Sequence, residues 1–227
     1  PAFELDGNGE PLDENSFEAL LEIKRGDNHS KLVEVIGAIN DDTLDFKTEV
    51  FEKYFNRENY LSWLASNILL GNADTSFHNY YLYNPKDTSN FYFVPWDYDL
   101  LSGNNFETTE ERKAKTPRYS QSVANWWFNR LHKRFLSEPG NFELLQEAVL
   151  ELKEKYYTNE IIQAKLDSYY DVIFPNVTSS PDIDYTYIGG NTNAERVATY
   201  NASFANLVNL VDNNYQLFLS CNCQRRG

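Results

Sequence analysis

The chain has little cysteine, no histidine cluster and no long hydrophobic run. Its two cysteines, Cys221 and Cys223, are separated by a single residue. A disulfide across that span is strained, and two thiolates cannot complete a zinc site, so we interpret both as incidental. The histidines His29, His78 and His132 are scattered without the spacing of metal ligands, which argues against a histidine metal site.

Positive charge is also scarce. Lysine and arginine number 20 against 34 aspartates and glutamates, and the formal net charge is −14 at pH 7. Nucleic acids and anionic membranes are bound by basic faces, so neither is expected as the main partner. The same acidity favours solubility and tolerates a basic protein substrate. No apolar stretch is long enough to cross a membrane, and no signal peptide is recognisable, so we expect no membrane segment within these 227 residues.

Apolar and aromatic residues are plentiful enough for a sizeable core. Hydrophobic residues make up 41% and aromatic residues 15% of the 227 residues, a length that suits one domain or one large lobe. Residues 1–15 are polar and rich in turn formers, which predicts a loop or the edge of structure that this chain lacks. Apolar side chains at three- and four-residue spacing then predict helices through Val35, Phe51, Leu64, Phe135, Leu145, Ile161 and Leu207. Residues 175–193 are rich in Asn, Ser, Pro and Gly and predict a loop.

The best-defined local signals lie between residues 56 and 94. Asn56 can cap a helix, and Gly71 follows the last apolar turn of that helix as a C-terminal glycine does. The aromatic segments 80–83 and 91–94 are separated by turn residues 85–90, which predicts a β-hairpin.

An acid, an amide and a second acid are placed around this hairpin. Asp74 precedes Asn79 by five positions, and Asp97 follows the second strand in the segment Pro95-Trp96-Asp97-Tyr98-Asp99. Antiparallel pairing would bring Asn79 and Asp97 to one side, near Asp74. Their order matches that of a phosphotransfer site, in which an Asp accepts the substrate hydroxyl proton while an Asn and a later Asp hold Mg²⁺.

These residues resemble a known family. Asn72-Ala73-Asp74, His78-Asn79-Tyr80-Tyr81-Leu82-Tyr83 and the Pro95–Asp99 segment are similar to the signature of the spore coat protein CotH kinase family, an atypical protein-kinase-like group. Leu21–Lys24 and the C-terminal helix resemble other segments of that family, so the resemblance covers roughly residues 15–220. His78 departs from it, since a second Asn or another small polar residue is expected there.

The resemblance implies a fold and an activity. We expect residues 1–227 to form a single, mainly α (α+β) unit, the helical C-terminal lobe of a protein-kinase-like fold, with a hairpin over 79–96 and helices over 123–220. It implies ATP and Mg²⁺ as cofactors and phosphorylation of Ser or Thr hydroxyls on a protein partner such as a coat or surface protein. The spore coat or cell surface is then the implied location, and the cytoplasm otherwise.

The implied roles follow the motif residue by residue. Asp74 would be catalytic, Asn79 and Asp97 would hold the metal, and Asp99 would be a second ligand or a structural anchor. The chain shows neither a glycine-rich loop before the motif nor a strand-borne lysine of the V-A-I-K type, which kinases use on the nucleotide. Since it also begins at Pro1 without Met, we expect a fragment that lacks the N-terminal lobe and is inactive or nearly so by itself.

Other interpretations remain open. Residues 102–122 fit an activation segment in kinase order and equally an ordinary surface loop. Asp74 and Asp97 could be drawn as a glycosidase pair, but that class gives no role to Asn79 or to the hairpin. A non-catalytic coat or scaffold protein that uses the kinase-like fold as a binding module is the main alternative.

Overall fold

The computed structural model describes residues 30–72, 75, 79–98, 129–185 and 189–221, together with the isolated residues 6, 12, 13, 15 and 24. Within these ranges the protein is mainly helical, with one two-stranded antiparallel sheet. This confirms the expected fold class, helices around a small hairpin. The identity of the arrangement with a kinase C-terminal lobe stays a prediction.

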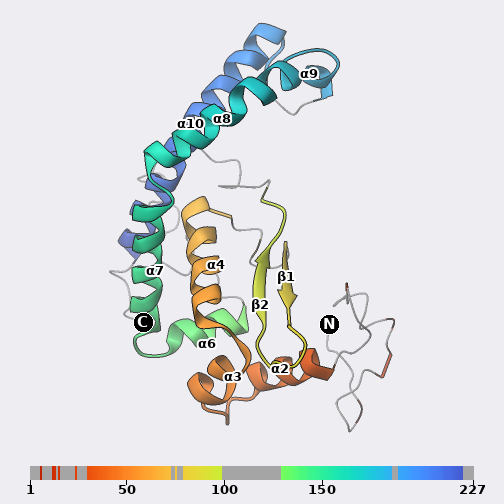
Figure 1. Cartoon of the computed structure of the whole chain (residues 1–227), viewed down its shortest axis with the longest axis vertical. Helices are drawn as coiled ribbons and strands as arrows, with labels where there is room; N and C mark the ends of the chain where they lie inside the picture. The colour runs from red at the N-terminus through yellow and green to blue at the C-terminus, as the bar shows by residue number, and fades with distance from the viewer. Residues whose placement is uncertain are drawn as a thin grey trace.

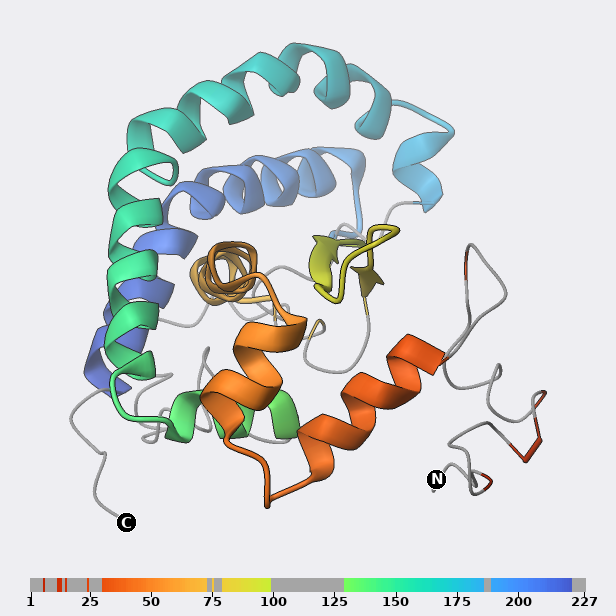
Figure 2. The same cartoon turned by 60° about the horizontal axis from the view of Figure 1, so that its bottom comes forward.

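Helix α4 (Arg57–Leu70) lies at the centre of the described structure, with helix α7 (Asn141–Lys155) on one side and the hairpin on the other (Figure 1). Figure 2 looks nearly along α4 and shows the same order around it. Helix α10 (Asn193–Cys221) also contacts α4. Because neighbours surround it, α4 buries side chains on most of its faces: Tyr60, Trp63, Leu64, Ala65, Asn67, Ile68 and Leu69.

Both ends of α4 are determined by local signals. The side chain of Asn56 accepts a hydrogen bond from the backbone N–H of Asn59 at 2.9 Å, as an N-cap does. Gly71 adopts the left-handed conformation with φ 65°, and its N–H reaches back to the carbonyls of Asn67 and Ile68. The predicted cap and the predicted C-terminal glycine are therefore confirmed.

The predicted hairpin is also confirmed. Strand β1 (Tyr80–Tyr83) pairs with strand β2 (Tyr92–Pro95), with Tyr80 opposite Pro95 and Tyr83 opposite Tyr92. Side chains alternate across the two faces of a strand, so Phe93 is buried against α4 while Val94 is exposed.

The chain before α4 forms helix α2 (Ser30–Asn40), the π-helical segment η1 (Phe46–Phe51) and the short helix α3 (Glu52–Tyr54). The helix through Val35 is thus confirmed, whereas the next apolar stripe forms a π-helical turn before it becomes α-helical. Asp45 caps η1 by accepting from the N–H of Thr48 at 2.8 Å.

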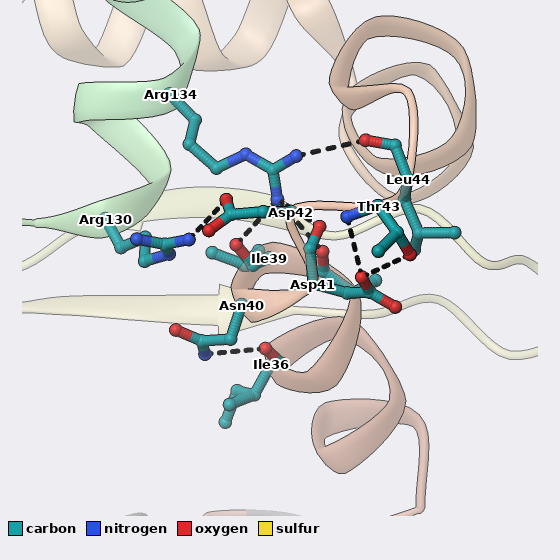
Figure 3. Close-up of polar contacts among 10 residues, drawn as sticks. Ile36, Ile39, Asn40, Asp41, Asp42, Thr43, Leu44, Arg130 and Arg134 are labelled. Carbon is teal, nitrogen blue, oxygen red and sulfur yellow. Dashed lines mark hydrogen bonds and ion pairs between the residues drawn. The ribbon is translucent and has the colours of Figure 1, made fainter.

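An arginine of helix α6 (Arg130–Ser137) closes the turn between α2 and η1 (Figure 3). The Arg134 guanidinium donates to the carbonyls of Ala38, Ile39, Asp41 and Leu44 at 2.8–3.3 Å. The same guanidinium lies 4.8 Å from the centre of the Phe46 ring. Carbonyls at the end of a helix have no partner within that helix, so one side chain satisfies several groups that would otherwise need water.

Helix α8 (Asn159–Val177) and α10 run side by side beyond the α4–α7 core, with the short helix α9 (Asp182–Tyr185) near their far end (Figure 1). The prediction of a loop from Pro175 onward is wrong in part, because α8 continues to Val177 and α9 follows. Pro175 removes one backbone donor from the last turn, and α8 buries none of its side chains, so solvent can reach the carbonyl that loses its partner. Helix α9 is stabilised by the fully buried Ile183.

The core is rich in aromatic side chains. Phe51, Tyr60 and Phe135 meet with ring centroids 4.6–5.1 Å apart, at tilted or edge-to-face angles that aromatic pairs favour.

Among the helices that the structure describes, none combines the length and the apolar character needed to span a bilayer.

Candidate functional site

Asn79 and Asp97 are the predicted site residues that the structure describes; Asp74, His78 and Asp99 lie outside the described residues. Asn79 immediately precedes β1, and Asp97 comes two residues after β2. Because Tyr80 pairs with Pro95, both residues lie at the same end of the hairpin, which we call the base. The rings of Tyr81 and Trp96 are in contact there, with centroids 5.4 Å apart, and hold the exit of β2 against β1.

Both base residues have an unusual backbone. Asn79 has φ 62° and Asp97 has φ 54°, in the left-handed region that L-residues other than Asn and Asp seldom adopt. Such conformations carry strain that persists only where the surrounding structure imposes it, and they concentrate at functional sites. The strain supports a functional role for this end of the hairpin.

The loop that should carry Asp74 is held firmly where it leaves α4. The N–H of Asn72 donates to the carbonyl of Asn67 at 2.9 Å, and the hydroxyl of Thr75 donates to the carbonyl of Asn72 at 3.1 Å. Asn72 and Thr75 are both buried. The loop therefore starts from a defined point beside the last turn of α4.

The side chain of Asn72 is 1% exposed, and neither its amide oxygen nor its amide nitrogen meets a hydrogen-bond partner in the structure described. A buried amide without partners is unfavourable by about 1–3 kcal/mol per unsatisfied group. Sequence reasoning quoted Asn72 as part of the family signature but assigned it no role. Its place in the N-x-D motif was the available signal.

Asn67 lies in the last turn of α4, and Tyr98 directly follows Asp97. Sequence reasoning singled out neither residue for the site. Burial raises the pKa of the Tyr98 phenol to about 12, while a hydrogen bond from the Asn67 amide acts in the opposite direction. Asn67 is fully buried and also donates from Nδ2 to the carbonyl of Trp63 at 2.8 Å. This contact brings the segment after Asp97 close to the origin of the loop.

His132 lies in the core beneath the hairpin. It is fully buried, its Nδ1 is 2.7 Å from the Tyr60 hydroxyl, and its ring stacks on that of Trp63 with centroids 5.7 Å apart. Burial lowers the pKa of His132 to about 3, so the imidazole stays neutral near pH 7. These surroundings are those of a packed core residue.

A magnesium ion fits the chemistry of the two described base residues. Asn79 offers an amide oxygen and Asp97 an exposed carboxylate, and Mg²⁺ prefers oxygen ligands. Within the described ranges, no group of three or more His, Cys, Asp or Glu residues is arranged to hold a metal. Of the four proposed site residues, Asp74 and Asp99 fall outside those ranges, so the complete ligand set is a prediction.

The chain belongs to the CotH kinase protein family, whose family model matches residues 3–218. Membership in a kinase family implies the use of a nucleotide. The chain is also similar to the inner spore coat protein H of Bacillus subtilis (strain 168), with 32% identity over 136 residues. That alignment covers 60% of this chain and 35% of the relative, so the chain spans about a third of that protein's length. No solved structure matches the chain significantly. The expected family is thereby confirmed.

Proposed function

We propose that this chain carries the phosphotransfer site of a Mg²⁺- and ATP-dependent kinase that modifies Ser or Thr hydroxyls on a protein partner. The observation that carries the proposal is the placement of Asn79 and Asp97. Both occupy strained left-handed conformations at the same end of the hairpin, next to the end of α4 where the loop with Asp74 begins. Membership in the CotH kinase family supports the reaction class.

Each residue has a distinct role in this proposal. Asp74 orients the acceptor hydroxyl and accepts its proton. The Asn79 amide oxygen and the Asp97 carboxylate hold the metal, and Asp99 is a further ligand or an anchor for the turn. When bound, Mg²⁺ would neutralise negative charge on the phosphates. The chain's own contribution is to keep its oxygen ligands and its base in fixed geometry, since positioning supplies most of the catalysis in phosphoryl transfer.

The partner and the location are proposed from the similar spore coat protein. The similar Bacillus subtilis protein is named an inner spore coat protein, and we propose a protein substrate in a coat or at a cell surface for this chain as well. A scaffold without catalytic activity is the alternative that the experiment must exclude.

Phosphate transfer in the protein expressed from its complete reading frame tests the proposal. Wild type, Asp74→Asn and Asp97→Asn would be incubated with radiolabelled ATP and a co-expressed partner. Asp97→Asn should weaken Mg²⁺-dependent nucleotide binding, because it removes a charged oxygen ligand. Asp74→Asn should leave nucleotide binding intact and lower turnover by about 10²–10⁴-fold, the range typical of a positioned general base.

Two outcomes contradict the proposal in different ways. Equal labelling in all three proteins removes the roles of Asp74 and Asp97. No labelling by a folded wild type, together with no nucleotide binding, favours the scaffold.

A further inference from the structure

Strand β2 has a second neighbour that is not a strand. Along the edge of β2 that faces away from β1, the N–H of Phe91 donates to the carbonyl of Tyr54 at 2.6 Å. The carbonyl of Phe91 accepts from the N–H of Asn56 at 3.4 Å. The entry of β2 is thus hydrogen-bonded to the backbone at the start of α4.

Two residues further along β2, at Phe93, the partner is a side chain of α4 in place of backbone groups. The Asn59 amide donates from Nδ2 to the carbonyl of Phe93 at 3.1 Å, and its Oδ1 accepts from the N–H of Phe93 at 2.7 Å. A primary amide that offers one donor and one acceptor side by side reproduces what a neighbouring strand presents in a ladder. The next residue on this edge is Pro95, which has no N–H to pair.

The same face of α4 continues toward the proposed site. The Trp63 ring stacks on Phe93 with centroids 4.3 Å apart, and Asn67 lies close enough to Tyr98 to influence the pKa of its phenol. Asn56, Asn59, Trp63 and Asn67 are spaced i, i+3, i+7 and i+11, so they follow one stripe of the helix. Contacts from this stripe accompany β2 from Phe91 to the residue after Asp97.

This arrangement determines where Asp97 lies relative to the loop. The loop begins at the C-terminal end of α4, whereas among the described residues Asp97 is connected to α4 through β2 and Tyr98. A slip of one residue in β2 would move Asp97 by about 3.3 Å and turn its side chain to the opposite face. A two-stranded hairpin is marginal by itself, so its pairing with β1 is a weak constraint on register.

We propose that Asn59 is a positioning residue of the phosphotransfer site: by pairing with both backbone groups of Phe93 it holds β2 in register on α4, and thereby fixes the position of Asp97 relative to the C-terminal end of α4. The inference rests on the proposed function of that site. Asn59 does not reach the reacting groups itself and acts through Phe93 and the strand.

The substitution Asn59→Asp tests the inference without weakening the helix. The carboxylate keeps an acceptor for the Phe93 N–H but sets a second oxygen against the Phe93 carbonyl, so the pairing is half lost. Asn59 is the third residue of α4, where a negative charge favours the helix. Asn141→Asp is the matched control, because Asn141 also lies in the first turn of a helix and donates to a backbone carbonyl, that of Phe135 at 3.0 Å, away from the hairpin.

Metal binding and hydrogen exchange are the measurements. In the protein expressed from its complete reading frame, Mn²⁺ binding would be titrated by electron paramagnetic resonance with a non-hydrolysable ATP analogue present. Asn59→Asp should raise the half-saturating Mn²⁺ concentration by about 10-fold or more, the usual effect of losing a group that orients a metal ligand. Amide exchange should speed up in the peptide containing residues 91–98 more than in peptides from α7 and α10. Asn141→Asp should change neither.

The outcomes separate the inference from the proposed function. If the wild type binds no Mn²⁺ and transfers no phosphate, the proposed function fails and the inference fails with it. If the wild type binds Mn²⁺ and Asn59→Asp binds it equally well, Asn59 is not a positioning residue and the proposed function stands. A weakening shared by Asn59→Asp and Asn141→Asp shows a general loss of structure and overturns the positioning role.

Discussion

The two ends of the hairpin both contain an aspartate in the left-handed conformation, and the surroundings of the two differ. At the tip, Asp87 has φ 69°, and the turn around it is held by several hydrogen bonds. Asn84 Nδ2 donates to the carbonyls of Thr88 and Asn90 at 3.1 and 2.8 Å, and Lys31 of α2 donates to the carbonyl of Thr88 at 2.7 Å. The strain at the tip is therefore balanced by visible contacts.

At the base, Asp97 has φ 54° and an exposed carboxylate that makes no hydrogen bond to any residue the structure describes. The Asp87 carboxylate is also exposed and has no hydrogen bond within the described structure, so the two ends differ in the contacts of the surrounding turn. We propose that the tip conformation serves the turn, whereas the base conformation presents the Asp97 carboxylate for metal binding.

The largest expected difference between the two ends is functional. Asp97→Asn should weaken Mn²⁺ binding by more than about 100-fold, since even groups behind a metal ligand contribute 10–100-fold. Asp87→Asn changes the same residue type in the same conformation at the other end and should leave binding unchanged. Titration of Mn²⁺ against both variants measures this, and similar losses in the two would abolish the distinction between tip and base.

Arg134 offers a way to loosen the support of the tip. It closes the turn after α2 (Figure 3), and α2 carries the Lys31 that donates to the carbonyl of Thr88 at the tip. Arg134→Ala should lower the free energy of unfolding by roughly 2–3 kcal/mol, because several carbonyls lose a charged donor. Below the unfolding transition, amide exchange should rise at residues 84–90 more than at 92–95.

Arg130→Ala is the control for Arg134. It removes an exposed ion pair with Asp42 from the same helix, and such pairs contribute at most about 1 kcal/mol. Equal destabilisation by the two substitutions, in a urea titration, would mean that the four carbonyl contacts of Arg134 carry no special weight.

Acid should lower the free energy of unfolding through the core that lies beneath the hairpin. The folded-state pKa of His132 is about 3, below the usual value of 6.5, so the unfolded chain binds the proton more readily. The stability associated with neutral His132 is present above pH 6.5 and is lost as the pH falls toward 3. Between pH 6.5 and 5 the loss should approach about 2 kcal/mol.

The substitution His132→Gln checks this assignment. Glutamine does not titrate and can still hydrogen-bond to the Tyr60 hydroxyl, so the loss of stability between pH 6.5 and 5 should shrink in this variant. Urea unfolding at a series of pH values gives the comparison, and an unchanged slope would mean that other groups cause the acid sensitivity.

Glycine at either end should have the smallest effect on stability. Asp87→Gly and Asp97→Gly each relieve a left-handed L-residue and should change the free energy of unfolding by no more than about 1 kcal/mol, toward greater stability. Only Asp97→Gly should abolish Mn²⁺ binding. Thermal unfolding combined with the Mn²⁺ titration tests both, and retained binding in Asp97→Gly would contradict the ligand role.

Sequence reasoning succeeded where the signals are local. The Asn56 cap and Gly71 delimit α4 through contacts within a few residues, and the turn residues 85–90 between two aromatic segments predict the hairpin. It failed in part at Pro175, where the helix continues because exposure makes the lost hydrogen bond tolerable. The roles of Asp74 and Asp99 stay predictions, since both residues lie outside the described ranges.

By itself, the sequence determined the family, the mainly helical fold class and the order of the proposed site residues, because caps, periodicity and motif spacing act between residues close in the chain. Only the tertiary structure decided the pairing of Asn59 with Phe93, 34 residues away, and the contacts of Arg134 with Ala38 and Leu44, 96 and 90 residues away. A side-chain amide can bond to any accessible backbone group and a guanidinium to any accessible carbonyl, so the residue type alone does not identify the partner. The partner is determined when packing of the aromatic core brings two distant segments within hydrogen-bond distance.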